Sequence, residues 1–111
     1  MEISHEKQGD VTIVALAGRL DAGATKAAED GLNAVLGPGA PHLAIDMSKL
    51  EYISSAGLRV LLVVAKKVQQ AKGKVVLFGL ASNVREVFSI SGFDQIFSIE
   101  PDADAAVAAV K

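Results

Sequence analysis

The sequence has no cysteine among its 111 residues. Disulfide bonds, thiolate nucleophiles and cysteine-based zinc sites are therefore excluded, and nothing in the composition points to an oxidising compartment. Aromatic residues are scarce and too dispersed to form a platform that stacks nucleic-acid bases. They are Tyr52, Phe78, Phe88, Phe93 and Phe97. A formal net charge of −2, with both signs mixed along the chain, also argues against a dedicated nucleic-acid binder.

Long apolar runs are absent as well. No run approaches the roughly 18 residues that cross a bilayer, so the 50% hydrophobic content belongs to a core or an interface. The first residues, Met1 to Glu6, lack the charged-then-apolar order of a signal peptide. We therefore expect a cytoplasmic protein without a membrane partner. The length predicts one domain over residues 1–111, with a single core.

Candidate catalytic groups are few. His5 and His42 are the two histidines, and neither lies near another candidate group in the sequence. Ser55 is not in the Gly-x-Ser-x-Gly turn of hydrolases, because Ile53 occupies the position of the first glycine. The run Gly37-Pro38-Gly39 lacks the Gly-Lys-Ser/Thr ending of a phosphate-binding loop. We predict no catalytic residues, no metal and no cofactor.

Strand-like and helix-like segments alternate after an initial hairpin, whose turn is predicted at Gly9-Asp10. Strands are expected at residues 3–8, 11–17, 42–46, 74–79 and 96–99. Helices are expected at residues 22–36, 55–71, 83–91 and from about residue 101 onward. This order predicts an α/β fold with a mixed sheet of four to five strands, covered by about four helices.

Several residues predict where the helices begin and end. Asp21 is a candidate N-cap for the first helix, which Gly37-Pro38-Gly39 is expected to end. Asn83 and Glu86 have the spacing of a capping box at the start of the third helix. Gly92 fits a C-terminal glycine cap of the same helix.

Two adjacent serines, Ser54 and Ser55, stand where the second long helix is expected to begin. A serine in this place meets unpaired backbone N–H groups and the positive end of the helix dipole. An added phosphate would be well tolerated there. Taken alone, these serines are open to two interpretations: they cap the helix, or they form a regulatory switch. Capping is the more common role of a serine in this position. Gly57 fits close packing of the first turn against the sheet.

The same helix predicts two faces. Its expected core stripe consists of Leu58, Leu61, Leu62, Ala65 and Val68. At about 100° per residue, Val60 and Val63 are predicted to project to the opposite side, beside basic residues. That side is a candidate docking surface. The alternative is that outward valines are ordinary surface residues, or that another element covers them.

Several ordered segments together resemble one protein family over almost the whole chain. Gly18-Arg19-Leu20-Asp21 is similar to the family's Gly-x-Leu-Asp, and Asp46-Met47-Ser48 to its Asp-Leu-Ser. The run from Tyr52 to Leu58 resembles its aromatic-apolar-Asp-Ser-Ser/Thr-Gly-Leu. Val84, Phe88 and Ser91-Gly92-Phe93 match its later Val, Leu-Phe and Ser-Gly-Leu pattern. The family is that of STAS domains, and within it the bacterial anti-sigma-factor antagonists.

This resemblance implies a partner switch. Unphosphorylated members bind an anti-sigma factor that is also a serine kinase, and thereby free the sigma factor. Phosphorylation of the serine after the motif aspartate breaks the complex, and a PP2C-type phosphatase restores it. On this alignment Ser55 is the phosphoacceptor, Ser54 replaces the motif aspartate and Ala56 replaces the second Ser/Thr.

The predicted site follows from this alignment. The surroundings of the phosphorylation site are expected to include Asp21, Asp46, Ser48, Ser54, Ala56 and Gly57. The candidate partner-binding residues are Arg59, Val60, Val63 and Lys67. Two other hypotheses remain open. One is a STAS module that senses a nucleotide, lipid or anion near the same helix N-terminus, and the other is a scaffold whose serines only cap the helix.

Overall fold

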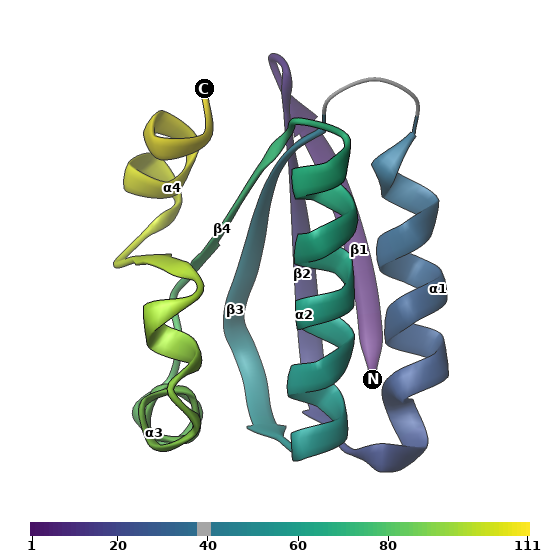
Figure 1. The fold of residues 1–111 in the computed structure, drawn as a ribbon, viewed down its shortest axis with the longest axis vertical. Helices are drawn as coiled ribbons and strands as arrows, with labels where there is room; N and C mark the ends of the chain where they lie inside the picture. Colours follow the sequence, from purple (N-terminus) through teal and green to yellow (C-terminus); the bar gives the residue numbers. More distant parts are fainter. Residues whose placement is uncertain (38–40) are drawn as a thin grey trace.

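The structure is a computed structural model that describes residues 1–37 and 41–111. In these residues five strands form one sheet in the order β1-β2-β3-β4-β5 (Figure 1). The strands are β1 (Glu2–Gln8), β2 (Val11–Leu20), β3 (His42–Ile53), β4 (Lys74–Phe78) and β5 (Ser98–Glu100). The helices are α1 (Thr25–Leu36), α2 (Ser55–Gln70), α3 (Ser82–Ser91) and α4 (Ala103–Val110), with short 3-10 turns η1 (Ala22–Ala24) and η2 (Phe93–Gln95).

The sheet is mixed, as the sequence predicts. Strand β1 pairs antiparallel with β2 across the turn at Gly9-Asp10, and the other three pairings are parallel. Parallel neighbours require a crossover, which α1, α2 and α3 supply between successive strands. The predicted α/β fold is therefore confirmed.

Strand β3 is longer than its predicted range of residues 42–46. It continues to Ile53 because β2 also extends to Leu20 and offers it a parallel partner along most of this length. Two register shifts interrupt the pairing. Leu50 and Ile53 are buried, whereas the polar residues between them are exposed. The residues between the predicted strand and α2 thus form a half-exposed continuation of β3.

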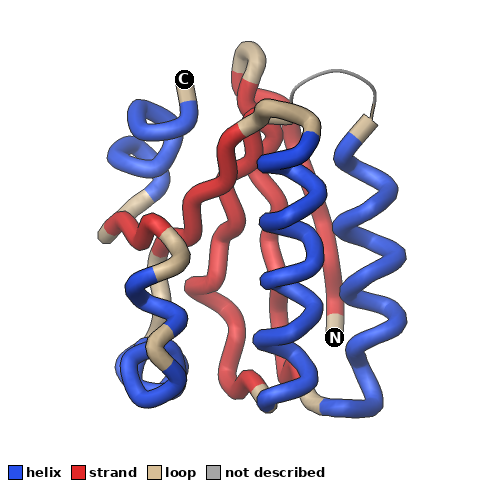
Figure 2. Tube along the Cα trace, in the orientation of Figure 1, coloured by secondary structure: helices blue, strands red, loops and turns tan. Residues whose placement is uncertain are grey.

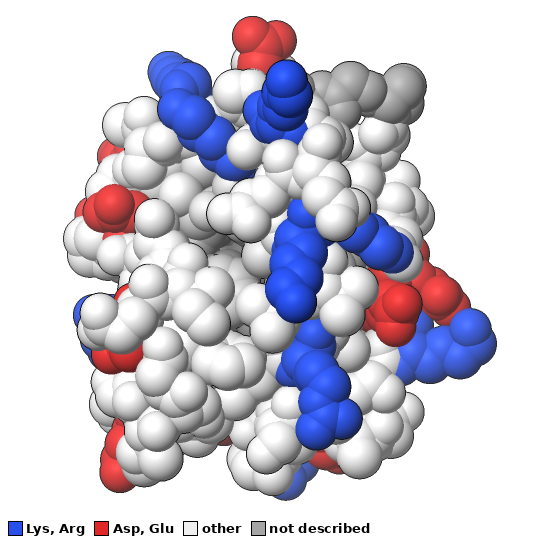
Figure 3. Space-filling model, in the orientation of Figure 1, with Lys and Arg blue, Asp and Glu red and all other residues white. Residues whose placement is uncertain are grey.

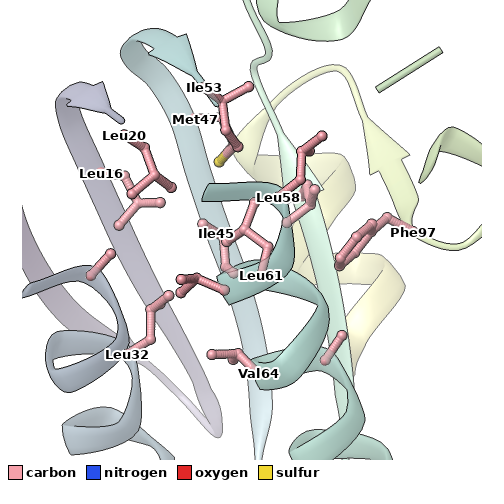
Figure 4. Close-up of a cluster of buried hydrophobic side chains, with 14 of the residues drawn as sticks. Leu16, Leu20, Leu32, Ile45, Met47, Ile53, Leu58, Leu61, Val64 and Phe97 are labelled. Carbon is pink, nitrogen blue, oxygen red and sulfur yellow. The ribbon is translucent and has the colours of Figure 1, made fainter. Parts of the chain in front are cut away.

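Side chains from the two faces of the sheet form two hydrophobic clusters. The larger one lies between the sheet and α1, α2 and α3, and Figure 4 shows Leu61 of α2 beside Ile45 of β3. The smaller one joins Val11, Ile13, Ala44, Val76 and Phe78 of the sheet to Ala106, Val107 and Val110 of α4. Alternation of side chains along each strand produces this division.

The ends of the helices agree only partly with the predictions. Asp21 does cap, but it caps η1, since its Oδ1 accepts a hydrogen bond from the Ala24 N–H at 3.1 Å. The predicted capping box at Asn83 is wrong, because α3 begins one residue earlier and Ala81 is its N-cap. Gly92 ends α3 in the left-handed conformation, with φ of 76°, as predicted. Pro38 and Gly39, predicted to end α1, lie outside the described residues.

The prediction that Val60 faces outward is wrong. Only 6% of Val60 is exposed. Helix α1 lies beside α2, so α2 is covered by α1 as well as by the sheet, and its buried face is wider than the predicted stripe (Figure 2). A hydrogen bond also joins the two helices: Lys67 Nζ of α2 donates to Asn33 Oδ1 of α1 at 3.1 Å. Val63 does face outward and is 39% exposed. Val60 is therefore a core residue, and it offers no surface to a partner.

Candidate functional site

Ser54 is the N-cap of α2, and its hydroxyl both accepts and donates a hydrogen bond. Its Oγ accepts a hydrogen bond from the Gly57 N–H at 3.1 Å and donates one to the carbonyl oxygen of Leu20 at 3.2 Å. The Ser54 N–H donates to the same carbonyl at 2.9 Å. These three bonds fix the end of β2 against the start of α2. Ser54 is thus a structural residue that joins two elements.

Ser55 occupies the first helical position of α2 and is exposed. The first N–H groups of a helix have no intrahelical acceptor, and the dipole places partial positive charge there. The first turn of α2 contains no acidic residue. An anion attached to the Ser55 hydroxyl would meet this positive helix end and solvent. From the sequence either serine could be the cap. In the structure Ser54 is the cap and Ser55 is an exposed residue of the first turn.

Gly57 permits the close approach of α2 to the end of β2. A Cβ atom on this residue would lie 2.7 Å from both the Cγ and the carbonyl oxygen of Leu20, and 3.0 Å from Cγ1 of Ile53. One of these atoms is backbone and cannot move aside easily. The prediction that Gly57 relieves packing against the sheet is confirmed.

Part of the predicted surroundings of Ser55 is brought together in the structure. Asp21 follows Leu20, the residue whose carbonyl binds Ser54, and so its carboxylate lies in the loop next to the serines. Ala56 is half-buried beside Gly57 in the first turn of α2. These residues and the two serines form one continuous site at the carboxyl ends of β2 and β3.

Asp46 and Ser48 lie elsewhere. Asp46 Oδ1 accepts hydrogen bonds from the Ser48 N–H at 2.9 Å and from Ser48 Oγ at 2.6 Å. Asp46 pairs in register with Ala15 of β2, whereas Ile53 pairs with Leu20. Five residues of strand correspond to about 16 Å, which separates Asp46 from the serines. The Asp46 carboxylate is hydrogen-bonded to Ser48 of the same motif, and this motif does not line the site around Ser55.

Two contacts near the site were not predicted. The guanidinium of Arg19 stacks over the ring of Tyr52, 4.4 Å from its centroid. The side-chain amide of Asn83 donates a hydrogen bond to the carbonyl oxygen of Glu51 at 2.8 Å, which ties α3 to the end of β3. Both contacts join residues about 30 positions apart. The first contact follows from the parallel register of β2 and β3, which pairs Arg19 with Tyr52, and the second from the packing of α3 against the end of β3. Neither arrangement can be read from the sequence alone.

The exposed side of α2 is basic. The helix carries Arg59, Lys66 and Lys67 and no aspartate or glutamate. Figure 3 shows basic side chains in a column over this helix, while acidic ones lie toward the margins of the same face. The one salt bridge among residues 1–37 and 41–111 joins Lys26 to Asp30, both on α1. The positive charges of α2 are thus not neutralised by neighbouring carboxylates in the described part of the chain.

Other kinds of site find little support. In the described ranges no helix is long and apolar enough to cross a membrane. Nor do three or more histidine, aspartate or glutamate side chains gather there as metal ligands would. His42, a candidate base from the sequence, enters β3 and its Nδ1 is hydrogen-bonded to the carbonyl oxygen of Val110. That contact fastens the end of α4 to the sheet, which is a structural role.

Comparison with known proteins identifies the family. Residues 2–106 match the STAS domain. The chain belongs to the STAS domain family. This STAS domain is 40% identical over 111 residues to BtrV of Bordetella bronchiseptica, named as an anti-sigma factor antagonist, and the match covers all of this chain and 96% of BtrV. It is 28% identical over 95 residues to an anti-sigma-B factor antagonist of Listeria monocytogenes, with 86% and 83% of the two chains covered.

A solved structure shares the fold closely. It is the crystal structure of an anti-sigma factor antagonist from Mycobacterium paratuberculosis, with a TM-score of 0.88 and 27% sequence identity. The superposition covers 98% of this STAS domain and 92% of that chain. The family resemblance and the fold class predicted from the sequence are both confirmed.

Proposed function

We propose that this STAS domain is a cytoplasmic anti-sigma-factor antagonist, which binds an anti-sigma factor that is also a serine kinase. The observation that carries the proposal is the 40% identity to BtrV over the complete chain. Relatives from three genera bear the name of anti-sigma factor antagonist, and their matches span most of each chain. The function is binding rather than catalysis.

Reversible phosphorylation of Ser55 is the proposed control. Its support is the difference between the two serines: the hydroxyl of Ser54 is held by Gly57 and Leu20, whereas Ser55 is exposed. A kinase needs a hydroxyl that it can reach without unfolding the helix. A PP2C-type phosphatase is the proposed activity that removes the phosphate and restores binding.

Replacement of the motif aspartate by Ser54 is compatible with this control. Serine and aspartate are both preferred N-caps because each presents an oxygen to the N–H groups of the first turn. Ser54 performs this task toward Gly57. Kinase recognition would then depend on the exposed hydroxyl and the shape of the loop, and not on a carboxylate at this position.

Phosphorylation would act mainly on the complex. The phosphate adds about 1.5 to 2 negative charges and three strong acceptors at neutral pH. The N-terminus of α2 can accommodate that charge, but a partner docked over Ser55 must desolvate it and make room for it. A loss of about 3 kcal/mol of binding free energy weakens the complex by more than a hundredfold.

The test is titration of the anti-sigma factor encoded nearest to this chain's gene with the wild type and with Ser55→Ala, Ser55→Asp and Ser54→Ala. We expect the wild type and Ser55→Ala to bind and Ser55→Asp to bind at least a hundredfold more weakly. Incubation with ATP should label the wild type and Ser54→Ala but not Ser55→Ala. Equal binding by Ser55→Asp together with no label on Ser55 would refute the switch.

A further inference from the structure

The basic charge of this chain is concentrated in one stretch. Residues 52–84, which include α2 and β4, carry five of the 11 basic residues and none of the 13 acidic ones. The five are Arg59, Lys66, Lys67, Lys72 and Lys74. The rest of the chain is consequently strongly acidic. Although the net charge is −2, the positive charge is thus unevenly distributed and gathers on one side of the molecule. A positive side favours a negatively charged partner.

A groove lies on this positive side, between α2 and the segment Ile96–Ser98. It has a volume of about 540 Å³. Its wall is largely apolar and includes Leu62 and Ala65 of α2, Val75 of β4 and Phe97. Lys66 and Lys74 also line it, and Figure 3 shows a hollow in the surface beside the basic column of α2. Ile96, at its edge, is 57% exposed.

The groove is continuous with the proposed phosphorylation site. Ser55, Arg59, Leu62 and Lys66 follow the spacing of one helix face, at intervals of four, three and four residues. Ser55 and Arg59 are exposed, and the last two residues line the groove. The stripe spans about 16 Å at 1.5 Å per residue. A protein surface of ordinary interface size covers that length.

We propose that this groove is a second anchoring site for the anti-sigma factor, which inserts an apolar side chain from an acidic surface between Lys66 and Ile96. The inference rests on the proposed function and specifies the chemistry of the partner. Carboxylates of the partner pair with Lys66 and Arg59, and Lys74 adds charge at the groove although its Nζ also donates to the carbonyl oxygen of Lys111 at 3.5 Å. Buried apolar contacts hold the complex while the charges orient it.

This arrangement also explains how one phosphate can disrupt a long interface. Ser55 lies one helical turn from Arg59, so a phosphate on Ser55 would occupy that guanidinium and reverse the charge at one end of the stripe. An acidic partner would then meet repulsion where it previously met attraction. The groove would still be present, but the partner would be held at one end only.

The experiment uses two charge or polarity changes at the groove and two matched controls elsewhere. Ile96→Glu is compared with Ile90→Glu, since Ile90 is 79% exposed on α3 and does not line the groove. Lys66→Glu is compared with Lys7→Glu, on the β1 edge of the sheet, the edge opposite β5. Binding of the anti-sigma factor is measured for each variant at low and high salt, and circular dichroism checks that each remains folded.

We expect Ile96→Glu and Lys66→Glu to weaken binding at least tenfold at low salt, and both controls to stay within twofold of the wild type. The effect of Lys66→Glu should shrink at high salt, because screening weakens exposed charge pairs. If Ser55→Asp abolishes binding in the same assay while the groove variants bind as the wild type does, the switch stands and the groove inference falls. If the wild type itself does not bind, both fall.

Two other occupants of the groove have distinguishable signatures. A second copy of the chain would make the wild type a dimer that Ile96→Glu dissociates, without a change in binding of the anti-sigma factor. A small amphipathic anion, with sodium dodecanoate as the probe, would bind in a saturable manner and depend on Lys66, again without a change in binding of the anti-sigma factor. Either result would overturn the proposal.

Discussion

The backbone N–H and the hydroxyl of Ser54 both donate hydrogen bonds to the carbonyl oxygen of Leu20, at 2.9 and 3.2 Å. The same hydroxyl accepts from the Gly57 N–H. Ser54, which replaces an aspartate in the family pattern, is therefore hydrogen-bonded both to the end of β2 and to the first turn of α2. Ser55, next in the chain, is exposed at the first position of α2. This division of roles between neighbouring serines leads to the first prediction.

Ser54→Ala should destabilise the domain more than Ser55→Ala does. Loss of the cap at Ser54 costs about 1 kcal/mol of unfolding free energy, or a fall in Tm of about 4 °C for a domain of this size. Removal of an exposed hydroxyl at Ser55 should change the unfolding free energy by less than about 0.5 kcal/mol. Urea denaturation of both variants measures the difference. The reverse order would make Ser55 the cap and would favour the scaffold hypothesis.

Gly57→Ala should also destabilise the fold, although alanine is the better helix former. The new Cβ would meet the carbonyl oxygen and Cγ of Leu20 at 2.7 Å. Overpacking of this kind costs about 1 to 3 kcal/mol of unfolding free energy. The matched control is Gly31→Ala in α1, whose Cβ would meet chiefly the flexible end of the Ile3 side chain, at 2.6 Å from Cδ1. Thermal melting should show a lower Tm for Gly57→Ala than for the control.

Local sequence signals predicted most of the fold. Turn and cap signals at Gly9-Asp10 and Gly92 placed the hairpin and the end of α3, and apolar periodicity placed α2 within a residue or so of its observed range. These features depend on neighbours in the chain. The pattern of short motifs then identified the family, which the match over residues 2–106 confirms.

The errors come from contacts between distant segments. Strand β3 extends to Ile53 because β2, some 30 residues earlier, offers it a partner. Val60 is buried because α1 packs against α2. Asn83 bonds to Glu51 across two elements and so does not cap its own helix. Periodicity describes one helix against one surface, and it misses a helix that is covered on two sides.

The burial of Val60 yields a prediction that separates folding from binding. Val60→Asp would place a carboxylate in the core without a partner, at a cost of more than about 3 kcal/mol of unfolding free energy. Val63→Asp, on the exposed side, should change the unfolding free energy by only about 0.5 kcal/mol. Denaturant unfolding monitored by circular dichroism tests both. Equal stability of the two variants would mean that α1 does not cover Val60.

Val63→Asp is then the informative variant for binding. Because the protein stays folded, a loss of affinity for the anti-sigma factor would come from the surface of α2 itself. An acidic partner should be repelled by the new carboxylate, and more strongly at low salt. Val63→Thr, which changes polarity without charge and keeps the β-branched shape, is the control and should lose less affinity. Equal losses in the two variants would argue against an acidic partner.

Phosphorylation of Ser55 should stabilise the isolated domain slightly while it weakens the complex. The phosphate would lie at the positive end of α2 and one turn from Arg59, an arrangement that contributes about 0.5 to 1 kcal/mol to the unfolding free energy. The gain should decrease below about pH 6, where the phosphate loses its second charge, and in high salt, where the interaction is screened. Melting of phosphorylated and unphosphorylated protein, with Arg59→Ala as the control, measures it. A phosphorylated domain less stable by more than about 1 kcal/mol would instead indicate that the switch acts by unfolding α2.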